Sequence, residues 1–429
     1  MKVVIIGAGF AGIKLARNLN NKSGIEVLLL DQNNYHQFQP LFYQVATAGL
    51  DASNISFPLR KIFHNSKNVR IRLAKVIGIS EDENIIITDI GDIFYDKLII
   101  ASGADTNFFG NQQLSDRCFP MKSTVEALQL RHRLIHNFED VLITTDKTIR
   151  QRLMTVIIVG GGPTGVELSG AIAEMKKYNL PNDFPEIDFT EMKIILVEAS
   201  GATLGAMSEK SQLQSKAYLY KLGVNVMLNT FLIDYDGESA TLNTGELIPA
   251  ATVIWAAGIK GNIPEGISPD LITKGNRIKV DRYSKVIGKE NIYALGDVAF
   301  METPKYKMGH PQVANVAINQ AKNLANNLLK THIGDANNIA LRAFEYFDKG
   351  SMATVGRNLA VVDLPSPKLH FGGFFAWLIW MFLHLMLILG VKNRLQIFIN
   401  WAYNYITFDQ SLRLIFKEFY KPNITAKKV

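Results

Sequence analysis

The N-terminal stretch constrains this chain more than any other. Apolar residues 3–6 predict a buried strand, and they run directly into the turn Gly7-x-Gly9-x-x-Gly12, with a helix expected over residues 13–19. In a dinucleotide-binding turn, the first glycine permits the bend and the second lets backbone approach a pyrophosphate. The third lets the helix pack on the strand. The helix N-terminus then offers its positive end to the phosphates.

An acidic residue stands where this kind of site needs one. Residues 27–30 predict the next strand, and Asp31 ends it, 22 residues after Gly9. A carboxylate at that place accepts hydrogen bonds from an adenosine ribose diol. The glycines alone would also fit a strand–helix turn that binds nothing. Asp31 favours the binding site.

The whole pattern occurs a second time. A strand over residues 155–159 leads into a second glycine turn, a helix follows over residues 166–176, and the strand over residues 193–197 ends in Glu198. The candidate nucleotide contacts of this turn are Gly160, Gly162, Pro163, Thr164 and Gly165. Two such sites in one chain predict a flavin and a nicotinamide, with hydride passing between them.

Glu198 also bears on which nicotinamide is used. A carboxylate favours a free ribose diol and repels a 2′-phosphate, whereas a 2′-phosphate site would need a nearby Arg. Residues 199–203 contain no Arg. We therefore expect NADH instead of NADPH, with a solvated acid at a strand end as the alternative interpretation.

Glu167 has two interpretations. Thr164 precedes it by three residues, and Thr-x-x-Glu is the pattern of a helix capping box. The functional interpretation places the carboxyl at the mouth of the nicotinamide site, against the reacting ring or on a proton path. Both stay open here, because a capping glutamate can also take part in chemistry.

Later strand ends carry small or polar residues. Two strands end in small residues that let backbone pass close to a flat ligand, namely Ala101, Gly103, Ala257 and Gly258. The strand over residues 291–297 ends in Asp297, which can accept from flavin ribityl hydroxyls or cap a helix. Gln312 and Ala314 stand near the start of a helix expected over residues 309–330, where the helix dipole favours electron density on a bound ring. Taken alone, Gln312 is an ordinary polar residue of a first turn.

Composition limits the class of protein. The 429 residues are 48% apolar and 20% charged, which indicates a folded chain of two or three domains. A single cysteine, Cys118, rules out a disulfide framework, a Cys-rich metal site and an iron–sulfur cluster, and we expect no metal. It fits a reducing, cytosol-facing location. The N-terminus is not expected to be a signal peptide, because its apolar run already serves as a strand.

The C-terminal part carries most of the excess positive charge. Residues 368–429 hold eight Lys or Arg against Asp409 and Glu418, a net +6 of the total +7. Within them, residues 371–390 contain no Asp, Glu, Lys or Arg and are long enough to span a bilayer. Glycines shorten the helical run, however, and the Trp and Tyr residues are typical of headgroup depth. We expect a segment lying in the interface of an anionic membrane, with a spanning helix, a dimer interface or a buried core as alternatives.

Together these motifs resemble the type II NADH dehydrogenases, single-chain NADH:quinone oxidoreductases of the two-dinucleotide flavoprotein group. The two fingerprints are shared widely, whereas residues 35–46 (YHQFQPLFYQVA) and 377–401 are more specific. The other segments that carry the resemblance are residues 7–12, 101–107, 160–174, 255–258, 294–297 and 311–314. The resemblance implies an α/β fold with two Rossmann-like, glutathione-reductase-like domains and a C-terminal membrane-associating helical segment.

The resemblance also implies a division of the chain and its sites. Residues 1–118 with 262–330 would bind FAD, residues 119–261 would bind NADH, and residues 331–429 would carry amphipathic or apolar membrane-anchoring helices. Non-covalent FAD would contact Gly7, Gly9, Phe10, Ala11, Gly12, Asp31, Gln32, Val76, Ala101, Gly103, Asp297 and Ala314. NADH would contact Gly160, Gly162, Pro163, Thr164, Gly165, Glu198, Ala257 and Gly258. Glu167 would be the catalytic acidic residue beside the nicotinamide.

On the quinone side the chain departs from the family pattern. Gln312 and Asn315 would line the quinone pocket below the flavin. The family's Ala-Gln-x-Ala-x-Gln reads Pro311-Gln-Val-Ala-Asn-Val316 here, which keeps Gln312 and Ala314 but changes other quinone contacts.

The implied function is NADH:quinone reduction without proton pumping. Hydride would pass from NADH to FAD, and two electrons would then reduce a menaquinone or ubiquinone. One short apolar segment offers no set of transmembrane helices to carry protons. The protein would be a homodimer, peripheral to the cytoplasmic face of the inner (plasma) membrane and attached through residues 368–429. No nucleic-acid partner is expected.

Three other functions were weighed against this one. A sulfide:quinone oxidoreductase shares the fold and a membrane end but works through paired cysteines, which Cys118 alone cannot supply. A slow-turnover, NADH-responsive flavoprotein that binds a partner would not need Gln312 or the membrane segment. A soluble electron-carrier reductase would have no use for the tail from Lys368 onward.

Overall fold

The computed structural model describes residues 1–333 and 340–416. Its first sheet is parallel, in the order β21-β9-β1-β2-β5. These strands are β1 (Lys2–Ile6), β2 (Glu26–Asp31), β5 (Val69–Leu73), β9 (Lys97–Ile100) and β21 (Ile292–Ala294). Helices α1 (Phe10–Leu19) and α11 (Ala314–Ile333) pack against each other. Val3, Val4 and Ile5 of β1 are fully buried, because a parallel sheet is covered on both faces.

The second sheet repeats this plan in the order β11-β18-β12-β13-β14. Its strands are β11 (Phe119–Pro120), β12 (Thr155–Val159), β13 (Lys193–Glu198), β14 (Asn225–Leu228) and β18 (Thr252–Trp255). Helix α8 (Pro163–Tyr178) follows β12 as α1 follows β1. In both sheets the strand before the glycine turn pairs with the strand that ends in an acid. The prediction of two Rossmann-like units is confirmed.

Shorter elements complete the two halves. The small strands are β3 (Tyr35–Gln37), β4 (Ser56–Pro58), β6 (Val76–Ser80), β7 (Ile85–Thr88), β8 (Gly91–Phe94), β15 (Leu232–Tyr235), β16 (Ser239–Leu242), β17 (Leu247–Pro249), β20 (Ile278–Val280) and β22 (Ala299–Met301). The short helices are α2 (Phe42–Ala46), α3 (Ala52–Ile55), α4 (Leu59–Ile62), α5 (Gln112–Arg117) and α9 (Leu180–Asp183), and α10 (Glu209–Lys221) is longer.

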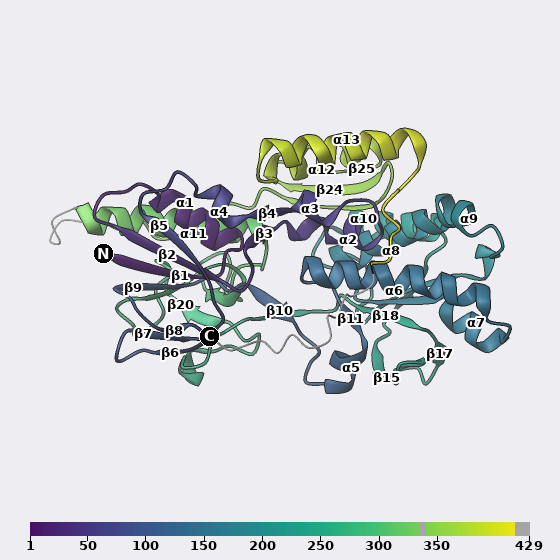
Figure 1. Cartoon of the computed structure of the whole chain (residues 1–429), viewed down its shortest axis with the longest axis horizontal. Helices are drawn as coiled ribbons and strands as arrows, with labels where there is room; N and C mark the ends of the chain where they lie inside the picture. The colour runs from purple at the N-terminus through teal and green to yellow at the C-terminus, as the bar shows by residue number, and fades with distance from the viewer. Residues whose placement is uncertain (334–339, 417–429) are drawn as a thin grey trace, which may run out of the picture.

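The chain passes between the two halves through a pair of strands. β10 (Ala104–Thr106) and β19 (Ile259–Gly261) pair antiparallel between them (Figure 1). The predicted domain boundaries after residues 118 and 261 stay proposals.

One predicted helix is wrong. We expected a single connecting helix over residues 138–152, whereas the chain forms α6 (Thr124–Ile143) and α7 (Lys147–Leu153). The break has a local cause, because the Asp146 carboxylate accepts from the backbone N–H groups of Thr148 and Ile149 and so starts a new helix.

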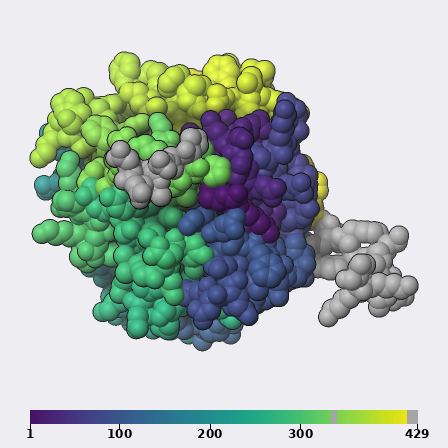
Figure 2. All heavy atoms as spheres, turned by 90° about the vertical axis from the view of Figure 1, so that its left-hand side faces the viewer, coloured from purple at the N-terminus to yellow at the C-terminus, as the bar shows by residue number. Residues whose placement is uncertain are grey.

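The C-terminal part is not purely helical, as we had expected. It begins with an antiparallel sheet of β23 (Ser351–Gly356), β24 (Leu359–Pro365) and β25 (Lys368–Gly372). Helices α12 (Phe374–Leu387) and α13 (Val391–Thr407) follow and lie along one edge of the molecule (Figures 1 and 2). Gly373 and Gly390 have positive φ values of 79° and 84° at the two helix starts, which confirms that glycines shorten the apolar run. Within residues 1–333 and 340–416, no helix combines the length and apolarity that crossing a membrane requires.

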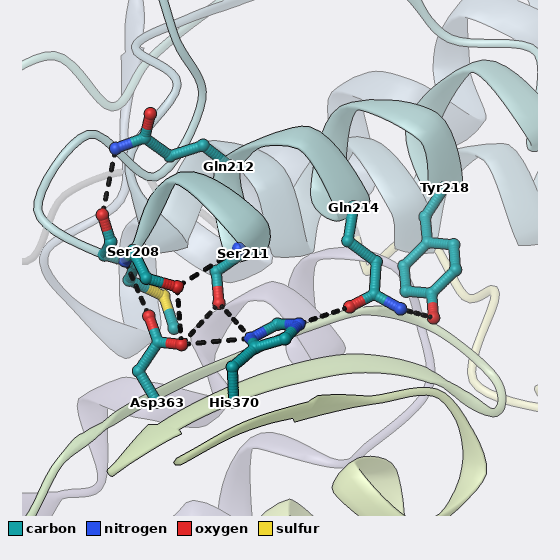
Figure 3. Close-up of polar contacts among 8 residues, drawn as sticks. Ser208, Ser211, Gln212, Gln214, Tyr218, Asp363 and His370 are labelled. Atoms are coloured by element: carbon teal, nitrogen blue, oxygen red, sulfur yellow. Dashed lines mark hydrogen bonds and ion pairs between the residues drawn. The ribbon is translucent and has the colours of Figure 1, made fainter. Parts of the chain in front are cut away.

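A polar network fastens this C-terminal part to α10 (Figure 3). Asp363 Oδ1 accepts from the hydroxyls of Ser208 (2.8 Å) and Ser211 (2.9 Å), and His370 Nδ1 lies 3.0 Å from the same oxygen. His370 Nε2 lies 3.0 Å from Gln214 Oε1. This is no nucleophilic triad, because serine and aspartate both face the same ring nitrogen. The network instead holds β24 and β25 against the second half.

Candidate functional site

The first glycine turn leaves space for a ligand. Gly7 has φ +98°, and a Cβ on Gly12 would lie 1.8 Å from the Gly7 carbonyl oxygen, so neither position accommodates a side chain. A Cβ on Gly9 would meet nothing within 4 Å. The backbone at Gly9 is therefore open exactly where the N-terminus of α1 begins, as a bound pyrophosphate requires.

The second turn has the same geometry. Gly160 has φ +110°, a Cβ on Gly165 would lie 1.9 Å from the Gly160 carbonyl oxygen, and a Cβ on Gly162 would meet nothing within 4 Å. Pro163 is the first residue of α8, where its missing N–H costs nothing. Both turns thus have the shape that a dinucleotide phosphate fits.

Each acid is tied to its own turn. Asp31 Oδ2 accepts from the N–H of Ala8 at 2.7 Å, and Glu198 Oε2 accepts from the N–H of Gly161 at 2.6 Å. The other oxygen of each carboxylate accepts from the N–H two residues further on, at 2.7 Å in both cases. The two acids therefore stand at equivalent places beside their glycine turns, and Gln32 lies exposed next to Asp31.

The other candidate FAD residues are spread around the first half. Ala101 is buried at the end of β9, and Gly103 beyond it has φ +72°. Val76 is half-buried in β6. Asp297 lies in a short helical turn whose N-cap is Leu295, so the alternative of Asp297 as an N-cap is wrong. Burial raises the pKa of Asp297, and the charges of Lys122 and Arg277 lower it.

The predicted quinone-side residues do not all converge. Helix α11 begins at Ala314, five residues later than expected. Gln312 lies just before it and donates through Nε2 to the Asp297 carbonyl oxygen at 2.9 Å. Asn315 instead points its amide nitrogen at the Tyr346 hydroxyl, 3.4 Å away, and its Oδ1 accepts from Asn319. Gln312 is thus joined to the candidate flavin site, whereas the Asn315 side chain is held by its own neighbours.

Glu167 is not a capping residue. The N-cap of α8 is Gly162, and no side chain caps this helix. Thr164 is consequently the second helical residue, and Glu167 lies within the helix with only 9% of its surface exposed. Its Oε1 accepts from the Thr354 N–H at 3.4 Å. Burial raises the pKa of Glu167 to about 8, although the Thr354 amide and the Trp380 indole lower it.

A close backbone contact explains this burial. A Cβ on Gly170 of α8 would lie 1.5 Å from the carbonyl oxygen of Val355 in β23, so the absence of a side chain lets the C-terminal sheet lie directly on α8. Glu167 and Glu174, one turn to either side of Gly170, are covered by that contact. Burial also raises the pKa of Glu174.

The two glutamates line a cavity of about 110 Å³ between α2, α8 and the C-terminal part. That volume holds about three water molecules. The other lining residues include Tyr43, Gln44, Arg357, Trp377, Trp380 and Trp401. Sequence reasoning missed this cavity, because its walls come from three distant segments. The spacing of Trp377, Trp380 and Met381 along one helix face was the one available signal.

Cys118 has no features of a redox-active thiol. It is 5% exposed, and burial raises its pKa to about 12. The thiolate that would attack a disulfide or sulfide-derived sulfur is therefore strongly disfavoured.

Comparisons with known proteins give a consistent result. Residues 1–321 match the family described as pyridine nucleotide-disulphide oxidoreductase, and residues 349–407 match the NDH2 C-terminal domain. The chain is 35% identical to the type II NADH:quinone oxidoreductase Ndh of Mycobacterium tuberculosis, over 95% of this chain and 88% of that protein. It is 28% identical to a type II NADH:quinone oxidoreductase of Haemophilus influenzae, over 84% and 86%.

Solved structures show the same fold. NDH2 from Plasmodium falciparum, solved in complex with NADH, superposes with a TM-score of 0.87 at 22% identity, covering 97% of this chain and 99% of that one. The sulfide:quinone oxidoreductase of Aquifex aeolicus gives a TM-score of 0.70 at 18% identity, with 92% of each chain covered.

The second turn allows a test with two matched substitutions. Gly165→Ala should lower the free energy of unfolding by about 2–3 kcal/mol, because its methyl group would overlap the Gly160 carbonyl. Gly162→Ala has room and φ −71°, and should cost within about 1 kcal/mol. It should nevertheless weaken NADH binding, since the methyl group fills the open space beside the helix N-terminus. Chemical denaturation and NADH titration measure the two effects, and equal destabilisation by both substitutions would contradict this account.

Proposed function

This chain belongs to the type II NADH:quinone oxidoreductase family, and from that premise we propose how its residues carry out the reaction. The reaction is NADH:quinone oxidoreduction without proton pumping. The observation that carries the assignment of sites is the pair of glycine turns with equal geometry, each with its own tethered acid.

The first turn is the proposed FAD site and the second the proposed NADH site. Asp31 and Glu198 would each accept from an adenosine ribose diol, and the open backbone at Gly9 and Gly162 would face the pyrophosphates. When bound, FAD supplies the chemistry of accepting hydride from NADH and passing two electrons to the quinone. The remaining predicted contacts belong to the same proposal, from Ala101, Gly103 and Asp297 around FAD to Ala257 and Gly258 near NADH.

Gln312 is the proposed polar contact on the quinone side. Its amide is joined to the Asp297 backbone, next to the predicted flavin contacts, which supports a position below the flavin ring. Asn315 is the weaker candidate, because Tyr346 and Asn319 already occupy its amide. Either menaquinone or ubiquinone would serve as the acceptor.

The sulfide:quinone alternative is disfavoured by Cys118, which is alone in the sequence and buried with a raised pKa. A slow NADH-responsive binding protein and a soluble electron-carrier reductase are separated from the proposal by kinetics, since neither would show fast quinone-dependent turnover.

Steady-state oxidation of NADH and NADPH with a short-chain quinone tests the proposal. NADH oxidation should depend on quinone, with NADPH much less active. Glu198→Gln should narrow the preference for NADH by about tenfold or more, because it removes charged hydrogen bonds to the ribose and the repulsion of a 2′-phosphate. Glu186→Gln, an exposed site in the same half, is the matched control and should change nothing. NADH oxidation that no quinone accelerates would refute the quinone function itself.

Glu167 is the proposed proton donor to the quinone. Its burial holds the carboxyl protonated up to a pKa of about 8, so a proton is available at neutral pH in a cavity that holds only a few waters. Ordinary glutamate would already have lost that proton near pH 4.5.

The pH dependence of turnover tests this role. Quinone-dependent kcat should fall as the pH rises through about 8, because Glu167 then loses its proton. Glu167→Gln should lower kcat by about 100-fold and remove that limb of the profile. The rate of flavin reduction by NADH, followed by stopped flow, should stay unchanged. Glu174→Gln, in the same cavity, should retain the limb. A slowed NADH half-reaction in Glu167→Gln would instead assign Glu167 to positioning the nicotinamide.

The outer faces of α12 and α13 form the proposed membrane surface. Large apolar side chains are exposed along both helices, among them Phe375, Phe382, Leu395, Phe398 and Ile406. The basic residues Lys368, Lys392 and Arg394 add attraction to anionic lipid. The last part of the predicted surface, residues 417–429, lies outside the described residues.

Vesicle flotation tests this surface. Phe382→Gln should lower partition onto anionic vesicles by about tenfold or more, because a side chain that is 61% exposed in the protein would bury its ring in lipid. Phe94→Gln is the matched control, with 62% exposure on β8 in another part of the chain. Equal loss in both variants would rule out a specific contribution of α12.

The homodimer and the cytoplasmic face of the inner membrane complete the proposal. The mass of the detergent-extracted protein by light scattering tests the dimer, and protease access in oriented membrane vesicles tests the face.

A further inference from the structure

His384 lies on the inner face of α12. Trp377, Trp380 and Met381 of that helix line the cavity beside Glu167. His384 follows Trp380 by four residues, which places it on the same face one turn further along. The neighbouring Phe382 and Leu383 are exposed on the outer face. His384 therefore stands where the cavity face of α12 continues toward the first half.

Aromatic contacts connect this ring to the first glycine turn. The imidazole stacks on Trp380, with 3.9 Å between ring centroids, and meets Phe38 edge-on at 6.3 Å. Phe38 in turn packs edge-on against Phe10 of the glycine turn, at 5.8 Å. A flat ring that moves from the membrane face of α12 toward the proposed flavin site passes along these side chains.

The tautomer of His384 follows from its partner. Nδ1 lies 2.7 Å from the Trp380 carbonyl oxygen, and because a carbonyl only accepts, Nδ1 carries the proton. Burial lowers the pKa of His384 to about 4, so the ring is neutral at physiological pH. Nε2 is consequently a hydrogen-bond acceptor. Among the described residues, none is hydrogen-bonded to it, and the side chain is only partly buried.

We propose that His384 is a further substrate-contacting residue, whose Nε2 accepts a hydrogen bond from a hydroxyl group of the hydroquinone product. A neutral acceptor attracts this hydroxyl, whereas it repels the lone pairs of a quinone carbonyl oxygen. His384 would thus favour the reduced form of the substrate over the oxidised form. This inference rests on the proposed quinone function and names one residue of the product site within it.

Binding of a matched pair of ligands tests the proposal. Dissociation constants for menadione and for its hydroquinone, menadiol, are measured without oxygen by titration calorimetry, using the full-length protein with FAD in detergent. His384→Phe keeps the aromatic stacking but removes the acceptor. It should weaken menadiol binding by about three- to tenfold and leave menadione within about twofold. Leu383→Phe, on the outer face of the same helix, is the matched control and should change neither constant.

His384→Gln gives an independent result should the phenylalanine variant lose its fold or its FAD. The glutamine amide can accept through oxygen or donate through nitrogen. Menadiol should therefore bind within about threefold of its original affinity, and menadione should bind more tightly than before. Equal changes for both ligands in His384→Phe, or unchanged constants in both variants, would overturn the proposal. Failure of the original protein to reduce menadione with NADH would instead overturn the quinone function.

Discussion

Both halves of this protein depend on one steric contact, made twice. The third glycine of each turn lies directly against the carbonyl of the first, and an added methyl carbon would come within 1.8 Å at Gly12 and 1.9 Å at Gly165. This contact presses the helix start onto the strand end. It thereby turns the helix N–H groups toward the open backbone at the middle glycine, and it places the next strand's acid beside the turn. Nucleotide sites follow from that geometry without any contribution from the rest of the chain.

The chemistry near Glu167 follows from a second close approach, at Gly170. A Rossmann-like helix has one side free to meet solvent, and here that side meets the backbone of β23. The contact removes water from two glutamates of α8 and creates a cavity that neither half could build alone. The network of Asp363 and His370 on α10 holds the same sheet in place (Figure 3). The C-terminal part is therefore more than a membrane attachment, because it also sets the electrostatic surroundings of the site.

The features that could be predicted from the sequence are those that depend on near neighbours in the chain. The glycine turns, Asp31 and Glu198 follow local spacing, and the structure confirms their arrangement. Glu167 could not be decided in this way, since the amide it contacts lies 187 residues further on. The capping box failed because Gly162 and Pro163 begin α8 earlier than Thr164. The C-terminal sheet was missed because antiparallel strands are stabilised mainly by partners that a single sequence does not name.

Burial acts in opposite directions on the two titratable groups that flank Trp380. It raises the pKa of Glu167 to about 8 and lowers the pKa of His384 to about 4, because removal of water disfavours whichever form is charged. At neutral pH, the carboxyl is thus a neutral donor and the imidazole a neutral acceptor. An apolar quinone needs both, since its carbonyl oxygens accept protons and the resulting hydroxyl groups then need acceptors. A single cause, exclusion of water by the C-terminal part, therefore supplies both groups in the form that reduction of a quinone requires.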